Sequence, residues 1–147
     1  MAFLSSMNIV GSGLTAQQLR LDIISENITN VNTTRTEAGG PYRRKLVVMQ
    51  EQALSPFQSA LQKALNGVEG QGGGVRVTEI VEDESDFKLV YDPTHPDANE
   101  EGYVEMPNVD MVMEMADAMA ANQALSADIT AFNVLKTVAA KGLEIGK

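Results

Sequence analysis

The 147-residue sequence contains no cysteine and no tryptophan, and its one histidine is His95. Without cysteine there can be no disulfide, no thiol nucleophile and no thiolate metal site. No apolar run reaches the about 18 residues that a membrane-spanning helix needs, so no segment is expected to span a membrane. The first residues lack the basic start and the long apolar stretch of a signal peptide, and we expect no cleaved one.

Residues that support catalysis are also scarce. His95 lies between two prolines in a turn-rich loop, and no motif supplies a nucleophile for it. The glycines of 67–74 are not followed by the Lys-Ser/Thr pair of a phosphate-binding loop. The acids of 82–86 lack the ligand spacing and central glycine of a calcium loop. The sequence therefore predicts no enzyme activity, no cofactor and no metal.

The net charge of −9 is unevenly distributed. Residues 1–50 hold five bases and three acids, whereas residues 51–147 hold six bases and seventeen acids. The acidic total argues against nucleic acid as a partner, because nucleic acid is bound by a basic face. The asymmetry suits head-to-tail contact between copies, with solubility alone as the alternative. The basic run Arg43, Arg44 and Lys45 is a candidate electrostatic contact with an acidic partner, or else a solvated strand edge.

The first thirty residues show the apolar spacing of a coiled-coil helix. A helix is expected from about residue 5 to 30, frayed at its start because Gly11 and Gly13 are poor helix formers. Its apolar side chains fill heptad positions and form a candidate assembly seam: Met7, Val10, Leu14, Leu21, Ile24, Ile28 and Val31.

The last forty residues repeat this pattern. Pro107 and Asn108 are a plausible helix start, and the apolar spacing continues to about residue 144. The second half of the candidate seam consists of Met111, Met115, Leu125, Ile129, Phe132 and Leu135.

The middle of the chain is richer in strand signals. Alternating stretches predict strands over 42–52, 75–81 and 86–92, followed by a short extended piece over 103–107, and a short helix is expected over about 55–66. The glycines of 70–74 are expected to be flexible. We therefore predict an α+β fold in which two long terminal helices pack as a coiled-coil-like pair. The helices would form one domain from 1–32 and 108–147, with a β-rich insert, 33–107, facing outward.

Such an insert is too small to cover both helices, so apolar stripes would remain to contact other copies. We expect the seam residues Leu21 and Ile24 to be largely exposed in the free subunit and buried only on assembly.

A polar stretch, "ENITNVNTTRT" at 26–36, ends the first helix. "SENITNVNTTRTEAGGPYRRK", 25–45, resembles the N-terminal signature of bacterial flagellar axial proteins, and its second half is similar to the proximal rod proteins of the FlgC family. "YDPTHPDANEEGYVEMPNVD", 91–110, and "FNVLKTVAAKGLEIGK", 132–147, are similar to that family's central and C-terminal motifs. The last helix departs from the pattern: Gln123 and Leu125 replace a usual Arg and Tyr, and Asp128 a common Asn.

This resemblance implies a structural subunit of the flagellar basal-body rod, the periplasmic drive shaft that transmits torque. Its partners would be other copies of itself, other rod proteins, the membrane-ring base and the flagellar type III export apparatus. Export through that apparatus would need no cleaved signal peptide. The alternative is a non-enzymatic helical adaptor that binds a single partner.

Asparagine tolerates bridge and left-handed conformations and can bond to free backbone groups. We therefore expect Asn27, Asn30 and Asn32 to form the junction between the first helix and the insert.

Overall fold

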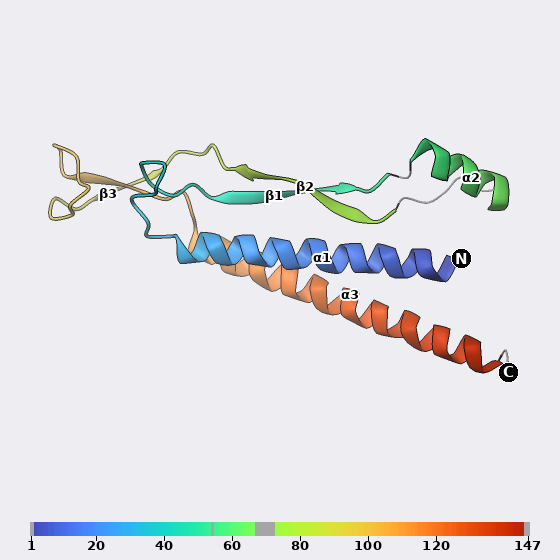
Figure 1. Cartoon of the computed structure of the whole chain (residues 1–147). Helices are drawn as coiled ribbons and strands as arrows, with labels where there is room; N and C mark the ends of the chain where they lie inside the picture. The colour runs from blue at the N-terminus through green and yellow to red at the C-terminus, as the bar shows by residue number, and fades with distance from the viewer. Residues whose placement is uncertain (1, 54, 67–72, 146–147) are drawn as a thin grey trace. The chain divides into compact units, whose positions relative to one another are not determined.

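The computed structural model describes residues 2–53, 55–66 and 73–145 and has an α+β fold, as predicted (Figure 1). Two long helices stand at the ends of the chain, with a small strand-rich insert between them. The elements are α1 (Ala2–Thr29), β1 (Lys45–Glu51), α2 (Pro56–Asn66), β2 (Val75–Glu82), β3 (Lys88–Tyr91), β4 (Tyr103–Met106) and α3 (Met111–Ile145). The strands form two two-stranded sheets, β1–β2 and β3–β4.

Both terminal helices were predicted from their apolar spacing. α1 begins earlier than expected and continues through Gly11 and Gly13. α3 begins at Met111, three residues after the predicted start at Asn108. Its cap is Asp110, whose Oδ1 accepts hydrogen bonds from the backbone N–H of Val112 at 2.9 Å and of Met113 at 3.4 Å. Asn108 does not cap the helix because its side chain bonds elsewhere.

The insert has the predicted elements, mostly with shorter bounds, although β2 ends one residue later than predicted. β1 begins at Lys45, so Tyr42 to Arg44 lie before the strand, and α2 confirms the short helix. β3 and β4 pair antiparallel, from Lys88 opposite Met106 to Tyr91 opposite Tyr103. The two tyrosine rings meet edge to face, with centroids 5.3 Å apart. The connection between these strands carries His95, whose Nδ1 accepts a hydrogen bond from the backbone N–H of Asp97.

Gly73 and Gly74, from the segment expected to be flexible, are hydrogen-bonded to Gln52, while 70–72 lie outside the described residues. Gln52 donates its N–H to Gly74 O and accepts the N–H of Gly73, both at 2.7 Å. Gly74 has φ +107°, and a Cβ there would lie 2.2 Å from Ser12 Oγ on α1. That hydroxyl accepts the N–H of Val75 at 3.0 Å. A side chain at position 74 would therefore displace the start of β2 from α1.

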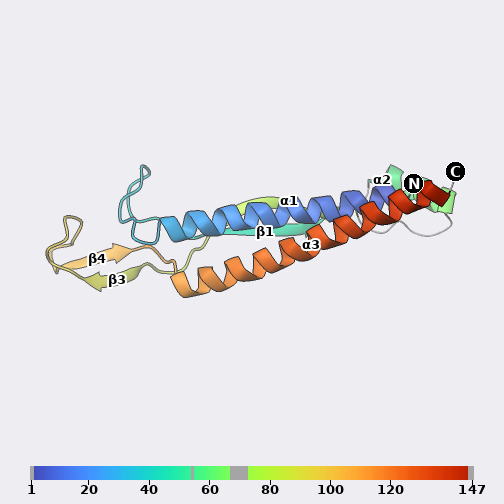
Figure 2. The same ribbon diagram turned by 90° about the horizontal axis from the view of Figure 1, so that it is seen from below.

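The chain divides into two compact units, and each contains part of α1, α3 and the β1–β2 sheet. The first unit comprises Met1–Gln18, Val48–Glu79 and Asn122–Lys147, and the second comprises Leu19–Val47 and Ile80–Ala121. Within the second unit, the end of α1 runs beside the start of α3, in the opposite direction, in both views (Figures 1 and 2).

The buried residues concentrate in the second unit. Its fully or nearly fully buried side chains are those of Ile23, Ile24, Asn27, Tyr42, Val104, Pro107, Val109, Glu114 and Ala121. Among the described residues of the first unit, only Ala16 is buried. Large apolar side chains there are exposed, including Leu4, Phe57, Val134, Val138 and Leu143. The second unit therefore has most of the buried core described, while both units expose large apolar side chains.

Candidate functional site: a buried polar joint

Asn27, on the last turns of α1, is the centre of a polar cluster in the second unit and is only 1% exposed. Its amide donates to Lys45 O at 2.9 Å and to Glu114 Oε2 at 3.1 Å. Its carbonyl oxygen accepts from Tyr42 Oη and from the backbone N–H of Lys45, both at 2.9 Å. These four bonds use the full capacity of an asparagine amide. One side chain thus joins α1, β1, the segment before β1, and α3.

Glu114, on the first turn of α3, is also 1% exposed, and its charge is balanced by Arg44. Glu114 Oε1 accepts from Arg44 Nε at 2.6 Å. The same guanidinium lies 3.3 Å from Asp117 Oδ2 and 3.7 Å from Asp83 Oδ2. Arg20 on α1 adds a second cation, 3.3 Å from Asp117 Oδ1. A buried carboxylate needs such pairing, because an uncompensated buried charge is strongly destabilising.

Asn108 connects this cluster to the end of β2. Its Oδ1 accepts the backbone N–H of Arg44 at 2.8 Å, and its amide donates to Asp83 O at 3.0 Å and to Ser85 Oγ at 2.9 Å. We call Asn27, Tyr42, Arg44, Asn108 and Glu114 the joint network. Because these residues come from α1, the segment before β1 and the α3 region, the network fixes the point where the insert leaves and re-enters the helices.

The pKa values of two residues at the joint network, Tyr42 and the neighbouring Asp83, are shifted by their surroundings. Burial raises the pKa of Tyr42 to about 12, with further contributions from the negative charges of Glu26, Glu114 and Glu82. The phenol therefore stays protonated and can donate to Asn27. Hydrogen bonds from Ser85 lower the pKa of Asp83, with a smaller contribution from Arg44, and keep that carboxylate ionised.

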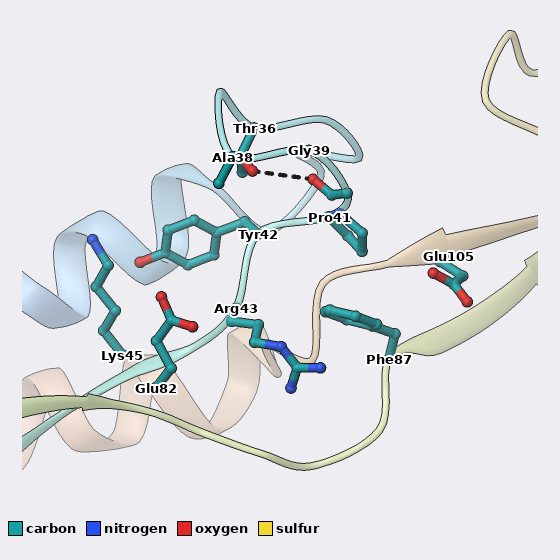
Figure 3. A pocket seen from close by; sticks show the side chains of 11 residues that line it. Thr36, Ala38, Gly39, Pro41, Tyr42, Arg43, Lys45, Glu82, Phe87 and Glu105 are labelled. Carbon is teal, nitrogen blue, oxygen red and sulfur yellow. Dashed lines mark hydrogen bonds between the residues drawn. The ribbon is translucent and has the colours of Figure 1, made fainter.

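A cavity of about 490 Å³ lies beside the joint network (Figure 3). The loop from Thr36 to Pro41 forms one wall, and Thr36 Oγ1 donates to Gly40 O within it at 3.2 Å. Arg43 lies over the ring of Phe87, 4.3 Å from its centroid, and donates to Asp83 O at 3.2 Å. Arg43 is thus engaged by its own chain, and the cavity lining contains no paired nucleophile and base.

The predicted junction residues have three different environments. Asn27 lies within α1, before the helix ends, and belongs to the joint network. Asn30 donates to Glu26 O at 2.9 Å, a carbonyl of the last helical turn, and accepts from Thr33 Oγ1 at 3.1 Å. Asn32 is exposed. No described residue other than glycine has a positive φ, so none of the three uses the left-handed conformation.

The basic run meets acids of its own chain. Arg44 contacts Glu114, Asp117 and Asp83, and Lys45 Nζ is paired with Glu26. The sequence had suggested that the acidic partners of this run lie on a neighbouring subunit. Contact between the run and another copy stays a prediction.

The predicted seam residues differ widely in exposure. Ile24 is only 6% exposed and belongs to the core of the second unit, so the expectation that it is exposed in the free subunit was wrong. Its neighbour Leu21 is half-buried rather than largely exposed. The other half-buried members are Met7, Val10, Leu14, Ile28, Val31, Leu125, Phe132 and Leu135, whereas Met111, Met115 and Ile129 are exposed.

Sequence reasoning missed Tyr42, Asn108 and Glu114 as members of a site. Glu114 did carry a signal, because it lies three residues after Met111 and four before Ala118, on the predicted apolar face of the last helix. An acid on such a face needs a buried partner, and the chain has few bases. Tyr42 and Asn108 gave no comparable signal, since turns commonly contain both residue types.

The described residues contain no group of three or more His, Cys, Asp or Glu side chains that could hold a metal ion. No described helix is long and apolar enough to cross a membrane. The polar residues that the fold brings together are bonded to one another, so the joint network stabilises and orients the elements of the fold. These features define an α+β protein whose terminal helices and insert meet at a buried polar network.

Two family models match the ends of the chain: "Flagella basal body rod protein" over residues 7–35 and "Flagellar basal body rod FlgEFG protein C-terminal" over residues 100–145. Curated relatives cover nearly the whole length. The chain is 48% identical to the flagellar basal-body rod protein FlgC of Bacillus subtilis over 97% of each chain. It is 43% identical to that of Borreliella burgdorferi, over 99% of this chain and 98% of the relative, and 38% identical to that of Salmonella typhimurium over the full length of both. The chain therefore belongs to the FlgC family of flagellar basal-body rod proteins, which are structural proteins and not enzymes.

Proposed function

We propose that this protein is a building block of the flagellar basal-body rod that assembles in a helical array and transmits torque across the periplasm. Its full-length similarity to FlgC proteins carries this proposal. The uncovered apolar surface of the first unit supports it, because a long helix with an apolar face needs a partner to cover that face.

In this proposal the terminal helices, 1–32 and 108–147, form the inner part of the rod, and the insert, 33–107, faces outward. The neighbours are further copies, other rod proteins, the membrane-ring base and the export apparatus through which the chain leaves the cytoplasm. The joint network has a mechanical role here. It transmits load between helices and insert through buried ion pairs and hydrogen bonds instead of a flexible linker.

The test is replacement of the FlgC protein in Bacillus subtilis by this chain, tagged within the exposed loop between β3 and β4. We expect swimming to be restored and the tagged chain to be present in several copies in purified basal bodies. A matched control carries Asn27→Ala, which removes the centre of the joint network. We expect this variant to accumulate in the cell to a lower level than the parent chain and not to restore swimming.

A single-partner adaptor predicts a different outcome. The tagged chain would be recovered from the cell as a closed one-to-one complex and would be absent from purified basal bodies. That result would overturn the proposal.

A further inference from the structure

The start of α3, drawn in pale orange in Figure 1, carries a group of exposed methionines. Four side chains there have exposed fractions of 39%, 60%, 50% and 68%, in the order Met111, Met113, Met115 and Met119. The other methionines whose side chains the structure describes are half-buried: Met7, Met49 and Met106. Half of the eight methionines of the chain thus lie close together on accessible surface.

Three of the four exposed methionines lie on one face of the helix. Met111, Met115 and Met119 are spaced four residues apart, so each stands about one turn beyond the last. We call these three residues the methionine row. Met113 lies on a different face, because two residues correspond to about 200° around an α-helix. The row is an uncovered apolar strip, and Met113 offers an equally exposed methionine outside it.

The methionine row stands on a well-held part of the helix. Asp110 Oδ1 accepts the N–H of Val112 at 2.9 Å, and Glu114 is paired with Arg44 at 2.6 Å. The row is therefore exposed because of its place on the folded helix and not because the helix end frays. Glu114 is only 1% exposed while Met115, next to it, is half exposed, so the row faces away from the joint network. A change of polarity in the row leaves that network intact.

Thioethers are the principal targets of two-electron oxidants in this chain, since it has no cysteine. With hydrogen peroxide, the sulfur attacks one peroxide oxygen, an S–O bond forms and the O–O bond breaks. The released hydroxide takes the proton of the S–OH group and leaves as water. Sulfur loses two electrons and the peroxide gains them. The product, methionine sulfoxide, is polar, and reductases return it to methionine.

We propose that the methionine row is a site of reversible sulfoxidation that controls the entry of this chain into the rod. The inference rests on the proposed function and adds a form of regulation to it. Oxidation of the free chain leaves the fold intact but turns an apolar strip into a polar one. An apolar neighbour then covers the sulfoxide oxygens only by leaving them unpaired, which is costly. The oxidised chain therefore stays out of the rod until its sulfoxides are reduced.

The first test is oxidation of the purified full-length chain by hydrogen peroxide at neutral pH, followed by peptide mass spectrometry. We expect sulfoxide to form severalfold faster at the four exposed methionines than at the half-buried Met7, Met49 and Met106. The helical circular dichroism signal should not change while the row is oxidised. Equal rates at exposed and half-buried methionines, or a loss of helix that accompanies oxidation of the row, would overturn the inference.

The second test changes the polarity of the row in the Bacillus subtilis replacement strain. Glutamine imitates the polarity of the sulfoxide and is a good helix former, whereas leucine keeps the row apolar and does not form a sulfoxide. The triple variant Met111→Gln, Met115→Gln and Met119→Gln should be folded. Its amount in purified basal bodies should be about tenfold or more below that of the triple leucine variant, since burying an unpaired polar group is penalised. The control pair, Met113→Gln and Met113→Leu, should differ little.

Sublethal hydrogen peroxide during assembly completes the test, with each strain compared to its own untreated culture. The amount of the parent chain in basal bodies should fall severalfold, and that of the triple leucine variant should not. If the triple glutamine and leucine variants enter basal bodies equally, or peroxide affects the parent and the leucine variant alike, the inference is wrong. The proposed function would still stand in either case, because it fails only if the parent chain itself is absent from basal bodies.

Discussion

Glu114 and Arg44 are the best-paired charges of the joint network, at 2.6 Å, and Glu114 is nearly inaccessible to water. Such a pair need not stabilise a protein more than apolar residues would. Breaking it is costly, however, because one charge remains buried. Substitution of either Glu114 or Arg44 alone is therefore expected to be destabilising, even if the pair contributes little net stability.

Replacing Glu114 by Gln keeps the shape of the side chain and removes its charge. Arg44 retains Asp117 and Asp83 at 3.3 and 3.7 Å. We therefore expect a loss of about 2 kcal/mol in the free energy of unfolding, below the about 3–5 kcal/mol of an isolated buried pair. Urea unfolding at neutral pH measures it. Glu144→Gln, an exposed position on the same helix, should change stability by less than about 0.5 kcal/mol. Equal effects of the two substitutions would contradict a stabilising network.

The raised pKa of Tyr42 predicts that the folded protein loses stability at alkaline pH. Its pKa is raised from 10.0 to about 12 in the folded protein, so the folded state holds the phenolic proton more tightly than the unfolded chain. The stabilisation is complete below pH 10 and is lost as pH rises from 10 to 12. We expect the stability difference between the parent chain and Tyr42→Phe to shrink over this range, as followed by urea unfolding at fixed pH steps. A difference that stays constant from pH 9 to 12 would contradict this assignment.

At the scale of elements, the start of β2 is held against α1 by a close approach. Gly74 combines a positive φ with a backbone position that leaves no room for a side chain beside Ser12. Gly39 and Gly40 have similar positive φ values of +86° and +83°, but nothing lies within 4 Å of a Cβ at either position. The three glycines thus share a positive φ but differ in the space around the position of a Cβ.

This difference predicts unequal effects of alanine. Gly74→Ala should cost roughly 2 kcal/mol or more, because backbone strain and a clash with Ser12 Oγ act together, whereas Gly39→Ala should show roughly 1 kcal/mol from strain alone. Hydrogen exchange at Val75, whose N–H donates to Ser12 Oγ, should quicken only in Gly74→Ala. The same exchange rate in both variants would show that the close approach does not hold this strand.

At the scale of the whole molecule, burial is distributed unevenly between the two units. The second unit holds nearly all the buried residues described, including Asn27 and Glu114. The boundary between the units falls within α1, after Gln18, and within α3, before Asn122. Each long helix is therefore expected to have one half stabilised by a core and another that depends on neighbours.

Hydrogen exchange of the purified free chain tests this division. We expect slow exchange in residues 19–29 and 111–121 and fast exchange in residues 2–18 and 122–145, because only the former lie in the unit with a buried core. After assembly, the fast segments should become protected. Continuous protection along either helix in the free chain would show that the first unit is stable without partners.

The amino-acid sequence alone predicted the terminal helices, the strand-rich insert, the absence of catalytic chemistry and the family. Helix periodicity and turn residues are local signals, and they were strong here because the apolar spacing extends over thirty residues at each end. The tertiary structure decided which apolar residues are buried within the chain. Ile24 and Met115 both fit the predicted seam, yet one lies in a core and the other on an exposed face. Only the fold brings Asn27 to Glu114, 87 residues later in the sequence, because such a contact depends on how the insert returns the chain to its helices and not on spacing along either helix.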